Sequence, residues 1–389
     1  MGLSKTSISV LCFVLLYTFG VADVQWLRYH TSTNPRDELN TQGNQYYRQF
    51  ENFRPEGVRC PEFKSDKPLF IKWNTTMDER GFRWIAMDRS AISGLYDLLY
   101  IDSNGNGHLD DEKPYQGRIG DQYRKTFDPI AVYFKGEDGP VTYHLACEFY
   151  SDDPQRSYLC ISAGSYYEGT ILIDGESVPC VLFDFNGNGT FDDKPGSYDT
   201  DRILLGSESN RQNMFLGRYL EYKDKLYRIN VARDGAFVEI MPAPDVAYGV
   251  VNVPANLTEF SASGINGLYT RAPKDGQLRL PEGTYRIYGW KIERNEKGQK
   301  WSLSGSDVPG DYAITVSSQS AVTVDVGEPV FSQLSVSEQK GIYSINQEFR
   351  GKLGERISIM KGSNRPPSPK VAIRSKSGEY DRTFSLEYG

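Results

Sequence analysis

Short runs of apolar and aromatic residues follow one another along the chain from about residue 59, and Gly, Asp, Asn and Pro separate them. Several runs alternate between apolar and polar positions, as strands with one buried face do. Leu278 and Leu280 alternate in one run, and Tyr285 and Ile287 alternate in the next. No stretch sustains the helical period beyond a turn or two. The pattern predicts an all-β chain of tandem β-sandwich or meander domains.

Dipeptides typical of hairpin turns connect several of these runs. Asp174-Gly175, Asp234-Gly235 and Asp138-Gly139 each stand between predicted strands, and residues 223–225 turn the chain once more. Tight hairpin connections favour positive φ at the turn, which Gly and Asp tolerate better than most residues. We therefore expect antiparallel hairpins at these places.

The order of the segments divides the chain into four parts. Residues 1–22 resemble an export signal, because Lys5 precedes an apolar stretch (residues 8–19) too short to span a bilayer, and small residues end at Ala22. Residues 23–58 are polar and predict an irregular lead-in. Residues 59–245 predict one β-domain, and residues 246–389, after the Pro-rich "MPAPD", predict one or two β-sandwich modules. No later segment predicts a transmembrane anchor, so we expect an extracellular or periplasmic protein.

The pattern D-x-N-G-N-G-x-x-D-D occurs twice within residues 59–245. One copy, "DSNGNGHLDD", begins at Asp102, and the other, "DFNGNGTFDD", begins at Asp184. A hydrophobic strand is predicted directly before each copy. The repeat indicates an internal duplication, with two related β-units packed as one domain.

The residue types in this pattern suit a hard cation such as Ca²⁺, which takes about six to eight oxygen ligands. Short oxygen-bearing side chains stand at loop positions 1, 3 and 5, a backbone carbonyl serves at position 7, and position 9 with its neighbour closes the site. Gly at position 6 permits a sharp turn, and an apolar residue at position 8 anchors the loop to the core. The candidate ligands are Asp102, Asn104, Asn106, His108 (carbonyl), Asp110 and Asp111, and Asp184, Asn186, Asn188, Thr190 (carbonyl), Asp192 and Asp193.

These loops depart from an EF-hand. Lys113 and Pro195 stand at position 12, where an EF-hand carries a bidentate Glu, and a strand enters each loop where an EF-hand has a helix. The loops resemble the calcium hairpin loops of integrin-type propeller blades and, more loosely, the dockerin loop. Similar loops occur in uncharacterised exported bacterial β-rich proteins. The resemblance covers the loops alone and implies structural Ca²⁺ sites.

The Asn content bears on the strength of such sites. With few carboxylates per site, the affinity should fall to about 10⁻⁴–10⁻³ M. The alternative is a turn without metal, in which Asp and Asn side chains bond to their own backbone and Gly completes the turn.

The net charge bears on the possible binding partners, and the cysteine positions bear on possible disulfides. The net charge of -7 gives no electrostatic reason to expect nucleic acid or an anionic membrane as a partner. Outside the predicted signal the cysteines are Cys60, Cys147, Cys160 and Cys180. Cys147 and Cys160 flank a predicted hairpin loop and could form a disulfide in an oxidising compartment. Alternatively, all four are small core residues of strands.

No catalytic motif appears. The three histidines form no metal-binding spacing, and the chain has no G-x-S-x-G elbow, P-loop or Rossmann glycine pattern. We therefore expect an exported, calcium-stabilised, non-enzymatic β-protein with a structural, adhesive or binding role, and a protein or a glycan of unknown identity as its partner.

The alternative is a carbohydrate-binding or carbohydrate-active protein. The 26 Tyr and 5 Trp motivate it, since exposed rings stack on sugars, although core packing also explains aromatic residues.

Overall fold

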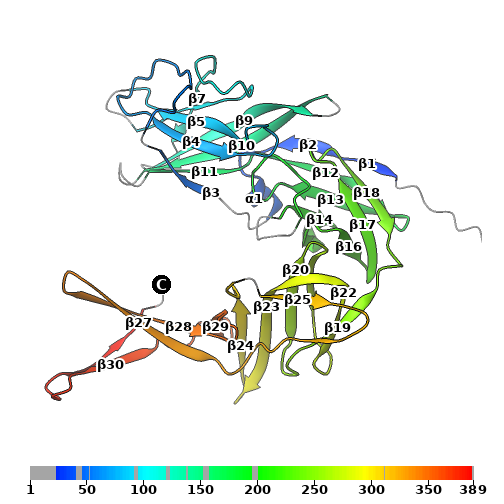
Figure 1. Cartoon of the computed structure of the whole chain (residues 1–389), viewed down its shortest axis with the longest axis vertical. Coiled ribbons are helices and arrows are strands. Elements are labelled where there is room, and N and C mark those ends of the chain that lie inside the picture. The colour runs from blue at the N-terminus through cyan, green and yellow to red at the C-terminus, as the bar shows by residue number, and fades with distance from the viewer. Residues whose placement is uncertain are drawn as a thin grey trace, which may run out of the picture.

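The computed structural model describes residues 23–40, 46–51, 53–91, 95–119, 123–136, 139–151, 157–194, 200–310 and 312–387. The chain is nearly all β, as predicted, and its described helical segments are α1 (Pro35–Leu39) and the 3-10 turn η1 (Glu208–Asn210). No helix in the described ranges has the length and apolar character needed to cross a membrane. Residues 1–22, the predicted export signal, lie outside the described residues. Figure 1 shows an open arc that runs from an N-terminal body to paired hairpins near the C-terminus.

Four antiparallel sheets make up the N-terminal body. The first has the order β4 (Leu69–Asn74), β5 (Phe82–Asp88), β6 (Leu98–Ile101), β7 (Tyr115–Gln116). The second has the order β3 (Tyr46–Gln49), β11 (Tyr158–Ala163), β10 (Gly139–Tyr150), β9 (Arg124–Gly136), β8 (Arg118–Ile119). The third has the order β15 (Gln212–Phe215), β14 (Arg202–Leu205), β13 (Glu176–Phe183), β12 (Ser165–Ile173), β2 (Arg28–Thr31). The fourth has the order β1 (Val24–Trp26), β18 (Phe237–Pro242), β17 (Lys225–Val231), β16 (Tyr219–Tyr222).

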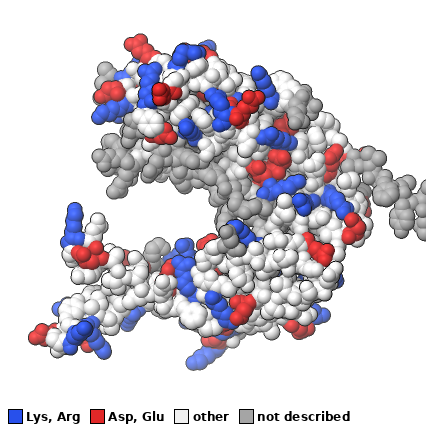
Figure 2. Space-filling model, viewed as in Figure 1, with Lys and Arg blue, Asp and Glu red and all other residues white. Residues whose placement is uncertain are grey.

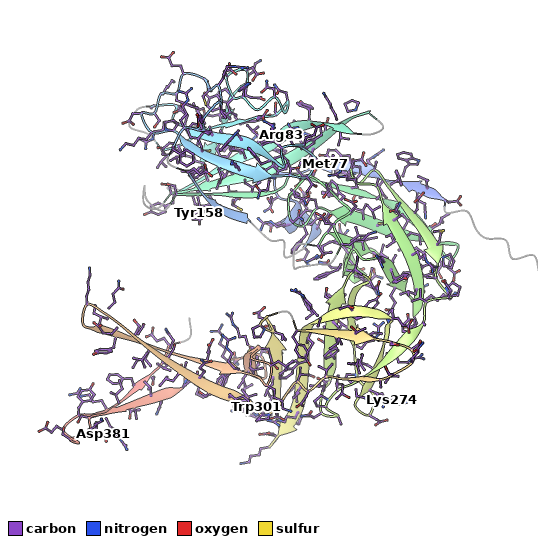
Figure 3. All side chains as sticks on the ribbon, in the orientation of Figure 1. Met77, Arg83, Tyr158, Lys274, Trp301 and Asp381 are labelled. Atoms are coloured by element: carbon purple, nitrogen blue, oxygen red, sulfur yellow. The ribbon has the colours of Figure 1, made fainter. Side chains whose placement is uncertain are left out.

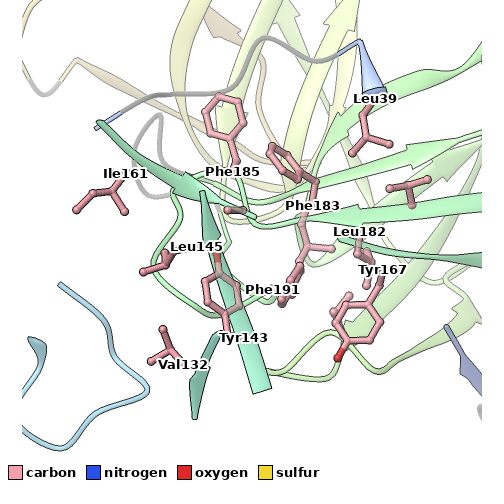
Figure 4. Packing of buried hydrophobic residues seen from close by; sticks show 14 of the residues in the cluster. Leu39, Val132, Tyr143, Leu145, Ile161, Tyr167, Leu182, Phe183, Phe185 and Phe191 are labelled. Carbon is pink, nitrogen blue, oxygen red and sulfur yellow. The ribbon is translucent and has the colours of Figure 1, made fainter. Parts of the chain in front are cut away.

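One hydrophobic cluster joins the two predicted units of this body. It includes Leu99 and Ile101 of β6 together with Phe183 and the loop residue Phe191. Figure 4 shows part of this cluster, with Tyr143 of β10 and Phe191 close together. A second, smaller cluster lies on the other face of the β4–β5–β6 sheet and contains Leu109. The loops that follow β6 and β13 are therefore attached to packed cores.

The segment predicted as an irregular lead-in is ordered over much of its length. β1 pairs with β18, β2 pairs with β12, and β3 pairs with β11. Each of these short strands adds to the edge of a sheet built from residues far along the chain. Polar composition alone misled the sequence interpretation, because an edge strand buries little side-chain surface and needs no apolar run.

The second body contains a small three-stranded sheet and a long sheet around one core. The small sheet has the order β22 (Gln277–Pro281), β19 (Tyr248–Asn252), β26 (Val322–Thr323). The long sheet has the order β21 (Gly267–Arg271), β20 (Glu259–Gly264), β23 (Gly283–Glu296), β24 (Gln299–Ser306), β29 (Arg356–Lys361), β28 (Ile342–Arg350), β27 (Phe331–Gln339), and β25 (Ala313–Val316) pairs with β23. The alternating residues Leu278, Leu280, Tyr285 and Ile287 are all buried in its core.

Two hairpins extend from the second body. β27 and β28 form one of them, and β30 (Lys370–Arg374) with β31 (Asp381–Ser385) forms a separate two-stranded sheet. In Figure 1 they occupy the end of the arc that carries the C-terminus. The C-terminal region is thus one packed module followed by hairpins, within the range of one or two modules that the sequence predicted.

The predicted turns form hairpins. Asp174 and Gly175 both have positive φ (56° and 80°) between β12 and β13. Lys223 and Asp224 do the same between β16 and β17. Gly235 has a φ of 85° in the β17–β18 connection. In the fourth predicted turn, Asp138 lies outside the described residues.

The Cys147–Cys160 disulfide that the sequence allowed does not form. In the β10–β11 ladder, Cys147 stands opposite Ile161, and Cys160 stands opposite Glu148. Because side chains alternate between faces along a strand, the two thiols point to opposite faces of the sheet. All four described cysteines are free, and only Cys60 is not fully buried. The alternative, small core residues, holds for Cys147, Cys160 and Cys180.

Gly235 tests how tightly the β17–β18 turn packs on the core. A methyl group at this position would lie 2.6 Å from the Tyr167 ring and 2.8 Å from the Phe191 ring. We expect Gly235→Ala to lower the free energy of unfolding of the N-terminal body by about 2–4 kcal/mol, since overpacking adds to backbone strain. Gly175→Ala is the control, because Gly175 also has positive φ but no atom lies within 4 Å of the added methyl. It should cost about 1 kcal/mol. Equal losses in urea denaturation would contradict the packing.

Candidate metal-binding loops

Each loop begins with a buried carboxylate at the end of a strand. Asp102 follows β6 and Asp184 follows β13, and both residues are 0% exposed. The backbone N–H at position 6 turns back to this carboxylate. Gly107 donates to Asp102 Oδ2 at 3.0 Å, and Gly189 donates to Asp184 Oδ2 at 2.8 Å. The position-1 side chain is thus the centre around which each loop closes.

The predicted roles of Gly and of the apolar position are confirmed. Gly107 and Gly189 have φ values of 85° and 96°, a region that L-residues with a Cβ seldom adopt. Leu109 and Phe191, both at position 8, are buried in the two hydrophobic clusters of the body. The loops are therefore held at one end by a strand and in the middle by the core.

The amide side chains of each loop converge on a single carboxylate oxygen at position 10. In the first loop, Asn104 and Asn106 donate to Asp111 Oδ2 at 2.9 and 2.8 Å. In the second loop, Asn186 and Asn188 likewise donate to Asp193 Oδ2, at 2.8 and 2.6 Å. Positions 3, 5 and 10 therefore meet at one carboxylate oxygen in both copies.

Position 9 and the side chains at position 7 lie differently. Asp110 is exposed and accepts a hydrogen bond from Arg59 Nε at 2.9 Å, and the His108 ring accepts from the Arg59 backbone N–H. Thr190 donates its hydroxyl to Asn188 Oδ1 and to Asp193 Oδ2. Asp192 is half-buried, and burial raises the pKa of its carboxyl. The structure thus places position 10, and not position 9, among the converging groups.

The hydrogen bonds of a metal-free turn are also present. Asn104 Oδ1 accepts from Asn106 N, and Asn106 Oδ1 accepts from His108 N, which are Asx turns. The second loop repeats both bonds. The described residues contain no group of three His, Cys, Asp or Glu side chains that could hold a metal ion. A cation in either loop would therefore depend on amide and backbone oxygens, and each Asn amide would have to rotate by about 180° to present its oxygen.

Arginine side chains lie beside the first loop. Arg80 Nη2 lies 2.8 Å from Asp102 Oδ2, and Arg80 also pairs with Asp78. The buried Arg83 donates to the backbone oxygens of Asp102 and Ser103. Asp102 Oδ1 nevertheless has no hydrogen-bond partner, although it is fully buried. The first loop thus holds a partly neutralised carboxylate with one oxygen left unsatisfied.

In the second loop a third carboxylate, Asp201, lies near Asp184 and Asp193, and the buried Arg202 stacks on Phe185 without an ion pair to these carboxylates. Asp201 is buried and accepts from the backbone N–H groups of Phe185 and Asp193, so it lies directly beneath the loop. Among the described residues, no Lys or Arg forms an ion pair with Asp184, Asp193 or Asp201. Burial raises the pKa of Asp184 to about 7, and burial together with the nearby Asp184 raises the pKa of Asp201 well above its usual range. Hydrogen bonds from Tyr143 and from backbone N–H groups, and not a paired positive charge, therefore stabilise the carboxylates of this loop.

Aromatic side chains support the second loop from the neighbouring sheets. Tyr143 of β10 donates its hydroxyl to Asp184 Oδ2 at 2.7 Å. Trp73 of β4 donates Nε1 to the backbone oxygen of Gly187 at 2.7 Å and stacks on Tyr143. These contacts connect the loop of one predicted unit to a strand of the other.

The turn between β4 and β5 lies against both loops. A methyl group placed on Gly189 would contact Thr75 and Met77, and one placed on Gly107 would collide with Arg80. In Figure 3, Met77 of this turn and Arg83 of β5 lie close together on the N-terminal body. One short segment therefore touches the second loop at its start and the first loop at its end.

Several residues around the loops were not identified from the sequence. Asp201 follows its loop by several residues in the sequence, Arg80 comes from the β4–β5 turn, and Arg83 and Tyr143 come from β5 and β10. One local signal did exist. The position-2 N–H of the first loop donates to Glu112, and in the second loop Asp201 accepts the same bond, so a carboxylate after the "DD" pair is a shared feature.

Arg80 should stabilise the N-terminal body through the buried Asp102. We expect Arg80→Gln to lower the free energy of unfolding by about 1–3 kcal/mol in the presence of a chelator, since it leaves a buried carboxylate without its counter-charge. Arg59→Gln is the matched control, because Arg59 pairs with the exposed Asp110. It should cost less than about 1 kcal/mol. Urea denaturation measures both, and a loss for Arg80→Gln no larger than that for Arg59→Gln would contradict the role of the ion pair.

Comparison with known proteins adds no family to this geometry. No protein-family model, no curated protein and no solved structure matches the chain. The candidate site therefore stands on the arrangement of its own residues: a buried Asp at the end of a strand, two Asn amides and a second Asp, repeated in two loops.

Proposed function

We propose that this chain is an exported, calcium-stabilised β-protein without catalytic activity, with a structural, adhesive or binding role. The observation that carries the proposal is Asp102 Oδ1, an oxygen of a fully buried carboxylate that has no hydrogen-bond partner. It belongs to a loop in which two Asn side chains and Asp111 face one point. An oxygen in this position is the group that a hard cation would engage.

The cost of burial supports a cation over an empty turn. A buried charged oxygen without a partner is destabilising, and the usual remedies are a paired charge, a hydrogen bond or a metal ion. The hydrogen bonds of the turn satisfy Asp102 Oδ2 but leave Oδ1 without a partner. A Ca²⁺ ion would satisfy this oxygen and draw the Asn oxygens inward at the same time.

The two loops should differ in affinity. In the second loop Asp184, Asp193 and Asp201 lie near one another with no paired cation among the described residues, so a divalent ion would relieve their mutual repulsion. In the first loop Arg80 already neutralises part of the charge on Asp102. We therefore assign the tighter site to the second loop and the weaker site to the first.

The proposed role of the metal is structural. Each loop connects the end of a central strand to the β4–β5 turn, so ions in the loops would strengthen the contact between these elements. Trp73, Trp84 and Trp290 are buried in the cores. Burial thus accounts for three of the five Trp that motivated a carbohydrate-active protein, and no arrangement among the described residues favours that second function.

Calcium should raise the melting temperature of the full chain. For sites of about 10⁻⁴–10⁻³ M, 10 mM Ca²⁺ adds about 1.4–2.7 kcal/mol per site through mass action, which corresponds to several degrees. Asp193→Asn should remove the tighter site in isothermal titration calorimetry. Asp192→Asn, its neighbour at position 9, is the control and should retain that site. An unchanged melting temperature between EDTA and 10 mM Ca²⁺ would overturn the proposal.

A further inference from the structure

The outer strand of the C-terminal hairpin is an open sheet edge. β27 ends the long sheet, and no strand in the described ranges pairs with its second edge. All nine of its residues are exposed. β28 joins β29 through a single residue pair, Arg350 with Arg356, so the hairpin extends well beyond the packed module. Figure 2 shows this part of the molecule as an arm separate from the main mass.

The middle of the hairpin is apolar on one face. Val336 stands opposite Ile345, and Leu334 lies two positions along the same strand, so the three side chains share a face. Tyr343 lies on that face too and is 69% exposed. The opposite face is polar in its middle, with Gln333, Ser335, Ser337, Ser344 and Asn346, and it carries Phe331 and Ile342 near its two ends. A two-stranded ribbon with an uncovered apolar face is only marginally stable in water.

β27 lacks the features that normally prevent pairing between edges. Exposed edge strands usually carry Lys, Pro or a bulge. β27, with the sequence "FSQLSVSEQ", has no Pro and no Lys, and Glu338 is its one charged residue. The described register with β28 also runs without a bulge from end to end. The edge is therefore long, regular and nearly neutral.

We propose that β27 pairs with β27 of a second copy of this chain, antiparallel and centred on Ser335. In this register Ser335 faces its own copy, and Leu334 faces Val336 of the second copy. The apolar faces of the two hairpins then lie on the same side and form one continuous apolar stripe with Ile345. An antiparallel pairing of identical strands is two-fold symmetric, which is the common geometry of homodimers.

The positions of the charged residue and of the apolar face favour the register centred on Ser335 over registers shifted by one or two residues. A shift of one residue would put the two apolar faces on opposite sides of the joined sheet. Centring on Val336 would place Glu338 opposite Leu334, and centring on Leu334 would place Val336 opposite Ser332. With Ser335 at the centre, Glu338 faces Ser332, so neither like charges nor a charge and an apolar residue oppose each other.

A cysteine at the two-fold centre tests both the partner and the register. In a Cys12→Ser, Cys60→Ser background, Ser335→Cys should form a covalent dimer on mild oxidation, because opposed residues of antiparallel strands have Cα atoms about 4.5–5.5 Å apart, within disulfide range. Ser337→Cys is the matched control. It lies on the same face, but the two copies of residue 337 would be about 14 Å apart along the strands, so they should not cross-link.

Oligomeric state gives the independent measurement. Sedimentation of the full chain should show a monomer–dimer equilibrium, and Val336→Lys should weaken it at least tenfold, whereas Ser344→Lys, on the polar face of β28, should not. Both variants should keep the calcium-dependent melting shift, so this proposal can fail while the calcium proposal stands. A chain that remains monomeric at all concentrations, or cross-linking through Ser337→Cys in preference to Ser335→Cys, would overturn the proposal.

Discussion

The burial of a carboxylate at the end of a central strand is the constraint on which the N-terminal body depends. Asp102 and Asp184 have no access to solvent, so their charge must be compensated within the protein. The two loops meet this demand differently. Arg80 neutralises the first carboxylate in part, whereas Tyr143 and backbone N–H groups surround the second. The same loop geometry thus supports two distinct electrostatic environments.

This constraint also explains why the two predicted units do not pack as independent pieces. The turn between β4 and β5 contacts both loops, and Trp73 of the first unit bonds to the backbone of the second loop. Both loops therefore contact the same short segment. If the loops hold Ca²⁺, the ions fasten the junction of two sheets, as expected for a metal with a structural role.

Much of the local structure could be predicted from the sequence, because each prediction depended on neighbouring residues. Alternation gave the strands around Leu278 and Tyr285, Asp174-Gly175 gave a hairpin, and the repeated Gly gave the sharp turns of the loops. The predictions that failed concerned contacts between segments far apart in the sequence. Short polar strands near the N-terminus pair with strands more than a hundred residues away, and the register of β10 with β11 separates Cys147 from Cys160.

In the candidate site, too, the local features were predictable from the sequence and the long-range contacts were not. The loop positions followed from spacing, but Arg80, Tyr143 and Asp201 come together only in the folded chain, and only the fold distinguishes position 10 from position 9 as the converging Asp. The β27–β28 hairpin has a local signal, the Lys340-Gly341 turn with positive φ at both residues, that the strand pattern alone did not bring out.

Sensitised terbium luminescence tests the central claim most directly, because Tb³⁺ occupies calcium sites and Trp73 bonds to the second loop. We predict that excitation of tryptophan produces terbium emission, that excess Ca²⁺ abolishes it, and that Asp193→Asn loses most of it. Absence of sensitised emission, or emission that Ca²⁺ does not displace, would contradict a calcium site in this loop.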